Sequence, residues 1–267
     1  MTTPLLIVVP TLDSFGLLPR LCTSLCEQSW SGWRVLFIDG PSSAEHREWL
    51  SQCCLSDSRF SWIPQDPNSP GIFGAMNQGF TAAAHQSVEW LLFWGSDDWA
   101  ASSTIFAEVF EAVHSSSSLT AQPDLIVCRG RYVNLASKYV KRSTSFHPEC
   151  CLDASSYRLA LLLGATPPHQ ATLFGVGARK ILGYYTSGFR LSADLDYFLR
   201  LSISPNICIR CLDLDLVYMS DCGVSATQTK RRLKEVRWAY KYAFGLIWWL
   251  PFLLRYIRRF VSLLSQS

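Results

Sequence analysis

The apolar run over residues 88–95, which contains Trp90-Leu-Leu-Phe-Trp94, is followed at once by two adjacent aspartates, Asp97 and Asp98. A run this short and this apolar is typical of a central strand that helices cover on both faces. The carboxyl ends of such strands are where open α/β sheets bind ligands. The feature therefore predicts a parallel sheet with two carboxylates at its ligand-binding edge.

Asp97 and Asp98 admit two interpretations. Neighbouring carboxylates repel each other unless a cation or hydrogen-bond donors compensate them, and oxygen ligands suit Mg²⁺ or Mn²⁺ bound to a phosphate group. The pair therefore predicts a metal site. The alternative is a strand-end turn followed by a helix cap, since Asp is a common N-cap and residues 100–110 are typical of a helix.

Short apolar runs and helical patterns alternate along the first half of the chain. Strands are expected at 5–10, 33–39, 60–64, 88–95 and 124–128. Helices are expected at 16–29, 43–54, 72–85 and 102–114. This alternation indicates α/β architecture with βαβ units and a mostly parallel central sheet flanked by helices.

The second half of the chain is less regular. Residues 129–146 are typical of a hairpin, 157–163 and 193–201 of helices, and 179–182 of a helical turn. The 267 residues suffice for one large α/β domain with a short appendage.

Ten cysteines occur as adjacent pairs and scattered singles, and the start of the chain does not have the pattern of a cleavable signal peptide. We therefore expect reduced thiols and a cytosolic compartment. Cys208 and Cys211 have the spacing of half a zinc site or a redox pair, but no second pair lies nearby and the stretch alternates like a strand. A structural role for both is favoured.

Charge is distributed unevenly along the chain. Residues 230–267 hold nine Lys and Arg and one Glu, which leaves 15 basic and 20 acidic residues in the remainder. The composition is 49% hydrophobic and only 17% charged, which favours contact with a membrane.

The basic tail has an uncharged stretch, residues 242–254, that is too short to span a bilayer, since spanning takes about 20 residues. Pro251 predicts a break or kink within it. Basic flanks together with Trp238, Trp248 and Trp249 favour a helix lying on the anionic cytoplasmic leaflet. The alternative is a helix packed on the body or on a partner. Nucleic-acid binding is disfavoured because the cations alternate with bulky apolar residues.

Six sequence blocks occur in a specific order. They are residues 9–13 (VPTLD), 37–40 (FIDG), 71–79 (GIFGAMNQG), 95–98 (GSDD), 169–174 (HQATLF) and 189–200 (FRLSADLDYFLR). This order resembles glycosyltransferase family 2 over residues 4–220. The resemblance implies a GT-A fold, a nucleotide-sugar donor and inversion of the anomeric carbon, as in bacterial surface-polysaccharide synthesis. Together with the basic tail, the resemblance predicts a catalytic part, residues 1–225, and a membrane-associating part, residues 226–267.

Four residues outside the Asp97–Asp98 pair are predicted to bind the donor. By the resemblance, Asp39 accepts a hydrogen bond from the base, and Thr11 and Asp13 lie near the base or ribose; both strand ends fall at the ligand-binding edge. A plain turn at 39–41 is the alternative for Asp39. Asn77 lies in a segment of small residues and offers an uncharged donor to the sugar or its phosphates.

The remaining predicted site residues are acidic. Asp98 matches the acidic metal motif and is the first choice as ligand of Mn²⁺ or Mg²⁺, with Asp97 binding ribose, donor sugar or the same metal. Asp194 aligns with the family's catalytic base at the start of the helix over 193–201. From the residues alone, Asp194 could instead be a helix N-cap, and Asp196 a salt-bridge partner of Arg200.

The chain departs from the family pattern at a few positions. Relatives commonly have Asp, Tyr and Asp where this chain has Ser69, Phe73 and Gly74. Two explanations stay open. Either Asp66 takes the place of a missing aspartate, or the donor sugar needs fewer hydrogen bonds. His169 either lines the acceptor cleft or is structural, and no metal is assigned to it.

The function predicted is that of a metal-dependent inverting glycosyltransferase that acts on a lipid-linked or cell-surface glycan. We expect it at the inner face of the plasma membrane, as a peripheral protein. A nucleotidyltransferase or dinucleotide-dependent oxidoreductase is disfavoured, because neither a Gly-x-Gly-x-x-Gly after residues 5–10 nor a phosphate-binding loop is present. A non-catalytic, membrane-associated nucleotide-sugar-binding module remains an alternative.

Overall fold

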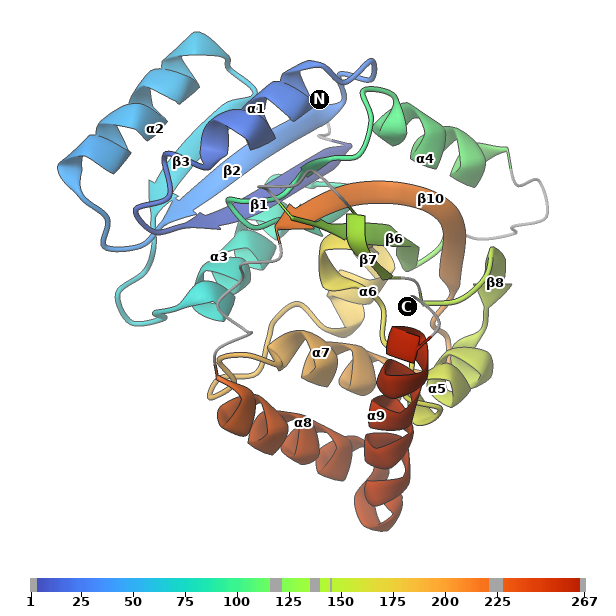
Figure 1. Cartoon of the computed structure of the whole chain (residues 1–267). Helices are drawn as coiled ribbons and strands as arrows, with labels where there is room; N and C mark the ends of the chain where they lie inside the picture. Colours follow the sequence, from blue (N-terminus) through green and yellow to red (C-terminus); the bar gives the residue numbers. More distant parts are fainter. Residues whose placement is uncertain (1–3, 116–121, 135–139, 145, 221–227, 265–267) are drawn as a thin grey trace.

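The computed structural model describes residues 4–115, 122–134, 140–144, 146–220 and 228–264. Its strands are β1 (Leu5–Thr11), β2 (Trp33–Asp39), β3 (Phe60–Pro64), β4 (Trp90–Phe93), β5 (Trp99–Ala100), β6 (Leu125–Val133), β7 (Val140–Thr144), β8 (Cys150–Leu152), β9 (Thr172–Gly175) and β10 (Ile209–Ser220). They form one sheet in the order β3-β2-β1-β4-β9-β6-β10-β5, with β7 beside β6 and β8 beside β10 (Figure 1).

The sheet is parallel on one side and mixed on the other. Strands β3, β2, β1 and β4 all run in the same direction, as the βαβ pattern predicts. β9 then enters antiparallel between β4 and β6, and β10 runs parallel to β6. β6 and β7 form the antiparallel hairpin expected over residues 129–146, although residues 135–139 and 145 lie outside the described part.

Helices cover both faces of this sheet (Figure 1). They are α1 (Leu18–Cys26), α2 (Ala44–Ser56), α3 (Ile72–His85), α4 (Ile105–His114), α5 (Ala154–Leu162), α6 (Val176–Ile181), α7 (Ala193–Leu201), α8 (Thr229–Phe244) and α9 (Trp249–Leu264), with short 3₁₀ turns η1 (His169–Ala171) and η3 (Gly245–Ile247). Side chains along β1 alternate between the two cores: Ile7 belongs to the core that includes residues of α1, α2 and α4, and Leu6 to the core that includes residues of α3, α5, α6 and α7. The architecture is the predicted α/β sheet flanked by helices.

The C-terminal tail folds as two helices rather than one. α8 ends at Gly245, whose φ of 55° suits glycine, and the chain then turns through η3 into α9. The break that the sequence places at Pro251 therefore lies a few residues earlier. Pro251 itself sits in the first turn of α9, where its missing N–H removes no helical hydrogen bond.

α8 packs against α7, and α9 packs against α5. Val236, Ala239 and Tyr240 of α8 are buried in the same core as α3 and α7. Among the helices of the described residues, none is long and apolar enough to cross a membrane. Helix α8 of the tail therefore packs into the core of the preceding domain. The assignment of catalysis to residues 1–225 and of membrane association to residues 226–267 stays a prediction.

The nine described cysteines are all free thiols, and Cys222 lies outside the described residues. Cys211 is buried within β10, and burial raises the pKa of its thiol to about 12. Such a thiol is a poor nucleophile and a poor metal ligand at neutral pH, in agreement with a structural role.

Candidate active site

Asp97 and Asp98 lie in a tight turn, Gly95–Asp98, which we call the acidic turn. The turn leaves β4 and leads directly into β5, so the helix α4 begins several residues later, at Ile105. The interpretation of the pair as a helix cap is therefore wrong. The Gly95 N–H donates to the Asp98 carboxylate at 2.6 Å, and the Asp98 N–H donates to the Gly95 carbonyl at 3.2 Å.

Gly95 is the first residue of the acidic turn and has no side chain. A Cβ at this position would lie 2.9 Å from Oδ1 of Asp97 and 3.3 Å from Oδ2 of Asp98. A side chain here would therefore press on both carboxylates. The close approach of both carboxylates therefore favours glycine at this position.

The two carboxylates of the acidic turn are poorly compensated. Asp98 is only 3% exposed, and burial together with the charge of Asp97 raises its pKa well above the ordinary value. Burial also raises the pKa of Asp97, opposed by a hydrogen bond with the Ser220 hydroxyl at the end of β10. Among the described residues, no Lys or Arg forms an ion pair with either aspartate.

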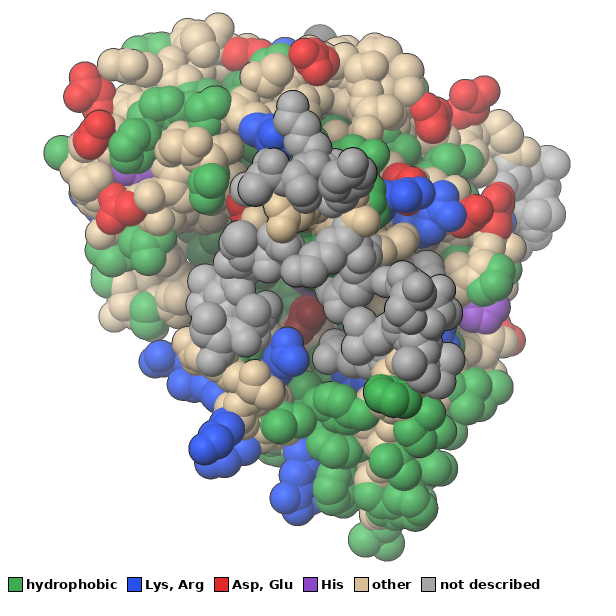
Figure 2. Space-filling model, in the orientation of Figure 1, with side chains coloured by type: hydrophobic (Ala, Val, Ile, Leu, Met, Phe, Trp, Pro, Cys, Tyr) green, Lys and Arg blue, Asp and Glu red, His purple; other side chains and the backbone are tan. Residues whose placement is uncertain are grey.

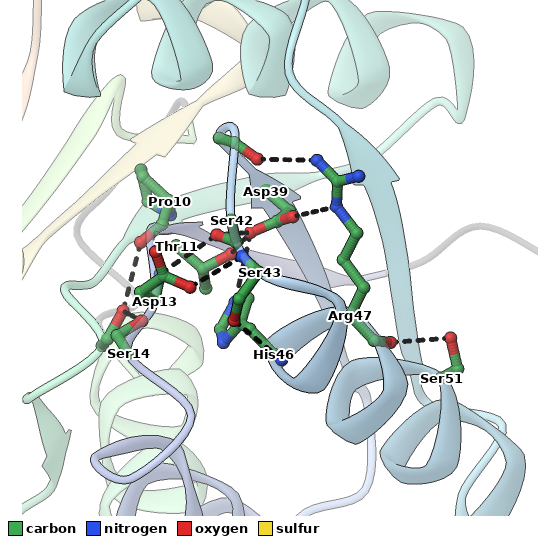
Figure 3. Close-up of polar contacts among 12 residues, drawn as sticks. Pro10, Thr11, Asp13, Ser14, Asp39, Ser42, Ser43, His46, Arg47 and Ser51 are labelled. Carbon is green, nitrogen blue, oxygen red and sulfur yellow. Dashed lines mark hydrogen bonds and ion pairs between the residues drawn. The ribbon is translucent and has the colours of Figure 1, made fainter.

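Asp39, at the end of β2, has the opposite environment (Figure 3). It is 1% exposed, and its carboxylate accepts hydrogen bonds from Thr11 Oγ1 at 3.1 Å, Ser42 Oγ at 2.6 Å and Arg47 Nε at 3.2 Å. The buried His46 places Nε2 3.1 Å from Asp39 Oδ1, without the geometry of a hydrogen bond. Thr11 and Asp39 are also register partners across β1 and β2. The protein itself therefore satisfies this carboxylate.

Asp13 joins two loops at the same edge (Figure 3). Its exposed carboxylate accepts the Ser43 N–H at 2.8 Å, which lowers its pKa, and its own N–H donates to Ser42 Oγ at 3.0 Å. The next residue, Ser14, donates to Ser96 Oγ of the acidic turn at 2.8 Å. The loops after β1, β2 and β4 are thus linked into one rim.

The side-chain amide of Asn77 makes two hydrogen bonds with the backbone of Tyr185. Its Nδ2 donates to the Tyr185 carbonyl at 3.0 Å, and its Oδ1 accepts the Tyr185 N–H at 2.6 Å. The side chain therefore ties α3 to the loop that precedes α7. One of the two Nδ2 hydrogens remains for a ligand.

Asp194 and Asp196 lie in the first turn of α7 but differ in their contacts. Asp196 is buried and accepts from Thr186 Oγ1 at 2.7 Å and from Arg200 Nε at 2.8 Å, as the i,i+4 spacing predicts. No hydrogen bond from the described residues reaches the half-buried Asp194 carboxylate, and Ser192 rather than Asp194 is the N-cap of α7. Asp194 is therefore the carboxylate that is available for chemistry.

His169 is a core residue. Its ring stacks on Phe93 with centroids 5.6 Å apart, and its Nε2 lies 2.5 Å from the Tyr185 hydroxyl. Burial lowers its pKa to about 4, although the charge of Asp194 opposes this. A neutral, buried imidazole agrees with the structural interpretation, and its contacts place Asp194 close to the strand that carries the acidic turn.

A cavity of about 700 Å³ lies between the start of α3, the loop before α7 and the start of α8. It is lined by residues 68–74, Asn77, residues 186–191, Gln228 and Arg231. Ser69, Phe73 and Gly74, the three departures from the family pattern, are all in this lining. A Cβ at Gly74 would lie 1.9 Å from the Ser69 carbonyl oxygen, so the loop with Ser69 occupies the space of a side chain at 74.

Comparisons with known proteins agree with this geometry. The family model "Glycosyl transferase family 2" matches residues 6–121. Two curated relatives, each a "PGL/p-HBAD biosynthesis glycosyltransferase", come from Mycobacterium bovis (strain BCG / Pasteur 1173P2) and Mycobacterium tuberculosis (strain ATCC 25177 / H37Ra). Each is 25% identical over 219 residues, which is 81% of this chain and 77% of the relative.

Residues 6–121 of the chain therefore match glycosyltransferase family 2.

Solved structures show that the chain has the GT-A fold. S. aureus TarS 1-349 superposes with a TM-score of 0.64 at 17% identity, over 89% of this chain and 64% of that one. The mannosyltransferase PcManGT from Pyrobaculum calidifontis, in complex with GDP-Man and Mn²⁺, gives 0.62 at 12% identity, over 96% and 70%. The chain thus spans slightly less than two thirds of TarS 1-349.

Several residues around the candidate site have no local sequence pattern that predicts their contacts. Ser220, at the end of β10, contacts Asp97 across more than 100 positions of sequence. Arg47 and Ser42 satisfy Asp39, and Arg231 lines the cavity from the tail. The only signal for Arg47 is its position one turn into a helix that follows Asp39; nothing in the sequence points to the other residues.

Proposed function

We propose that this protein transfers a sugar, with inversion, from a nucleotide-sugar donor to a hydroxyl group of a lipid-linked or cell-surface glycan. The observation that carries the proposal is the poorly compensated pair of the half-buried Asp97 and the buried Asp98 at the ligand-binding edge of the sheet. Named relatives in PGL/p-HBAD biosynthesis, and neighbours solved with UDP, UDP-GlcNAc and GDP-Man, support a nucleotide-sugar donor.

The acidic turn fits a divalent cation. Asp98 accepts one backbone N–H and lies against a second carboxylate, and such a site favours a hard cation that takes its remaining ligands from phosphate and water. In the described residues, no third acidic, His or Cys side chain joins them. Asp98 would hold Mn²⁺ or Mg²⁺, with Asp97 beside it, and the ion would neutralise the diphosphate as it departs.

The nucleoside would lie along the rim made by Thr11, Asp13 and Asp39. In this proposal Thr11 and Asp13 lie near the base or ribose, and Asp39, held rigidly by its donors, faces the base. Asn77 would give its free Nδ2 hydrogen to the donor sugar or a phosphate oxygen.

Asp194 would act as the general base. Its carboxylate takes the proton of the acceptor hydroxyl as that oxygen attacks the anomeric carbon and the bond from that carbon to the diphosphate oxygen breaks. The attack comes from the face opposite the leaving group, so the configuration inverts. Asp196 would keep α7 in place through Arg200 and Thr186.

The tail would bind an anionic membrane surface at the inner face of the plasma membrane. One face of the tail, which we call the apolar stripe, carries side chains that are about half exposed or more, at helical spacing: Leu246, Trp249, Leu253, Ile257 and Phe260. Figure 2 shows hydrophobic side chains gathered over α9, with Lys and Arg along α8. Each Lys or Arg near anionic lipid contributes about 1 kcal/mol.

Sedimentation with vesicles tests the membrane proposal. The protein should bind vesicles that contain phosphatidylglycerol, more weakly at high salt, and the double variant Leu253→Ser/Ile257→Ser should bind less because it buries less apolar area. Leu55→Ser, which changes an 87% exposed leucine on α2, is the matched control. Equal sedimentation of all three proteins would assign the apolar stripe to a protein partner instead.

A screen of donors tests the catalytic proposal. Purified protein is incubated with UDP-, GDP- and dTDP-sugars, with and without Mn²⁺, and both thermal shift and donor hydrolysis are measured. Turnover of one donor that requires the metal is expected. The departures at Ser69, Phe73 and Gly74 favour one other candidate, a membrane-associated module that binds nucleotide sugars without turnover, and a thermal shift with no hydrolysis or transfer would select it.

A further inference from the structure

Glu235 on α8 is a buried carboxylate that the catalytic proposal does not use. It is 6% exposed and accepts three consecutive backbone N–H groups: Arg190 at 3.1 Å, Leu191 at 2.8 Å and Ser192 at 3.0 Å. Arg231, one turn earlier on α8, donates its Nε to the same carboxylate at 3.0 Å. Both carboxylate oxygens are therefore engaged, and their partners lie more than 40 positions away in sequence, apart from Arg231.

The three amides lie immediately before the candidate base. Ser192 is the N-cap of α7, its side chain makes no capping bond, and Asp194 is two residues further on. A negative charge at this end also complements the dipole of α7. At the N-terminus of a helix, the acceptor for free backbone N–H groups is usually the side chain of the N-cap residue. At α7, Glu235 of α8 supplies this acceptor instead.

The loop before α7 is held at both ends. At its start, Asn77 bonds both backbone groups of Tyr185. At its end, beside the Glu235 contacts, the Phe189 ring stacks on Trp238 of α8 with centroids 4.9 Å apart and planes 11° apart. The tip between them, at Gly188, has a φ of 95° and open space around it. The loop therefore takes its position from α3 on one side and α8 on the other.

Docking of α8 does not require this carboxylate. Val236, Ala239, Tyr240 and Ala243 already bury the apolar face of α8 in the main core. Burying a charge has a desolvation cost, which its hydrogen bonds offset only when the geometry is good. What the contacts specify is the position of three backbone amides next to the cavity and to Asp194.

We propose that Glu235 is a positioning residue for sugar transfer: it fixes residues 190–192 and thereby the orientation of Asp194. This makes α8 part of the catalytic machinery rather than only a membrane anchor. The inference rests on the proposed role of Asp194 as the base.

Glu235→Gln tests the inference because it keeps the size of the side chain but replaces one acceptor oxygen with an N–H₂ group that faces N–H donors. With UDP-GlcNAc or GDP-mannose, whichever the enzyme turns over, we expect kcat to fall by about 10- to 100-fold, as misplacement of a reacting group does. The donor KM should change by less than about twofold, since the metal site and rim are untouched.

Asp124→Asn is the matched control. Asp124 accepts the Cys208 N–H at 2.8 Å and so also joins distant segments through a carboxylate, but at the far side of the sheet. We expect a lower Tm and an unchanged kcat. If Glu235→Gln does not fold, Glu235→Asp replaces it, because the shorter side chain keeps the charge but withdraws the carboxylate from the three amides; a wild-type kcat in that variant would overturn the proposal.

Hydrogen exchange provides a readout that does not depend on activity. In Glu235→Gln, and not in Asp124→Asn, the amides of a peptide covering 189–193 should exchange faster. Unchanged exchange, or faster exchange with a wild-type kcat, would overturn the positioning role. If the wild-type protein turns over no donor, the proposed function fails, while the exchange experiment still decides whether Glu235 holds the loop.

Discussion

Asp39 and Asp98 are both buried carboxylates at the ends of parallel strands, on either side of β1, yet their surroundings are opposite. Asp39 receives hydrogen bonds from Thr11, Ser42 and Arg47, whereas Asp98 receives one backbone N–H and faces the charge of Asp97. A carboxylate that the protein satisfies holds structure in place. A carboxylate that the protein leaves without enough hydrogen-bond donors can bind a ligand that supplies the missing interactions.

The same contrast recurs at the start of α7. Asp196 is bound by Thr186 and Arg200, and Asp194, two residues away, accepts no hydrogen bond from the described residues. Their separation by two positions turns them in different directions on the helix. In each pair, the carboxylate with several protein donors is assigned a structural role and the other a role in binding or catalysis. Single substitutions can test this assignment.

Asp98→Ala should have the largest effect. If Asp98 holds the metal that stabilises the departing diphosphate, its loss removes several kcal/mol of barrier lowering, or about 10⁴-fold in kcat/KM. The thermal shift on adding Mn²⁺ with the nucleotide should disappear as well. The fold should persist, because the variant removes a buried carboxyl group that the protein itself compensates poorly. If the variant retains the metal-dependent shift, Asp98 does not differ from Asp39 in the way proposed.

Asp194→Asn should lower kcat by about 10²- to 10⁴-fold, the usual contribution of a general base. Donor binding and the Mn²⁺ shift should stay at wild-type levels, because neither involves α7 directly. Asp196→Asn is the paired control: it removes the Arg200 ion pair, so its main effect should be on Tm. Equal losses of kcat in both variants would show that the two carboxylates do not have separate roles.

Asp39→Asn should act on stability before catalysis. The substitution leaves Arg47 and two hydroxyl donors with a neutral partner that can satisfy fewer of them, at a cost of about 1–3 kcal/mol in the free energy of unfolding. Chemical denaturation measures this cost, and nucleotide binding by calorimetry should weaken in the folded variant. A variant as stable as the wild type would mean that the hydrogen bonds around Asp39 do not stabilise the rim.

The sequence predicts the parts of this site that depend on chain-local patterns. The bounds of β2, β3, α3 and α7 agree with those expected from the sequence. The Asp196–Arg200 pair follows from helical spacing in the same way. The acidic turn was placed correctly after β4, although periodicity could not show that β5 rather than a helix follows it.

What the sequence could not predict depends on long-range packing. Ser220 reaches Asp97 because β10 pairs with β5, and Glu235 reaches Ser192 because α8 packs on α7. The sheet is also less parallel than the alternation suggests, since β9 enters antiparallel between β4 and β6. Each of these contacts joins two segments that are distant in the sequence, and the local pattern of neither segment indicates which other segment it contacts.

The pH dependence of stability should show the smallest effect. Because burial and Asp97 raise the pKa of Asp98, the native state without metal binds a proton that the unfolded chain releases near pH 4. The free energy of unfolding therefore falls as pH rises from that value to the raised pKa, by at most about 1.4 kcal/mol per pH unit. Asp98→Asn lacks this contribution, so in EDTA its Tm relative to the wild type should rise with pH. Because Mn²⁺ binds the ionised carboxylate, adding it should reverse the trend in the wild type alone, and a constant Tm difference across the range would mean that Asp98 does not titrate as its burial requires.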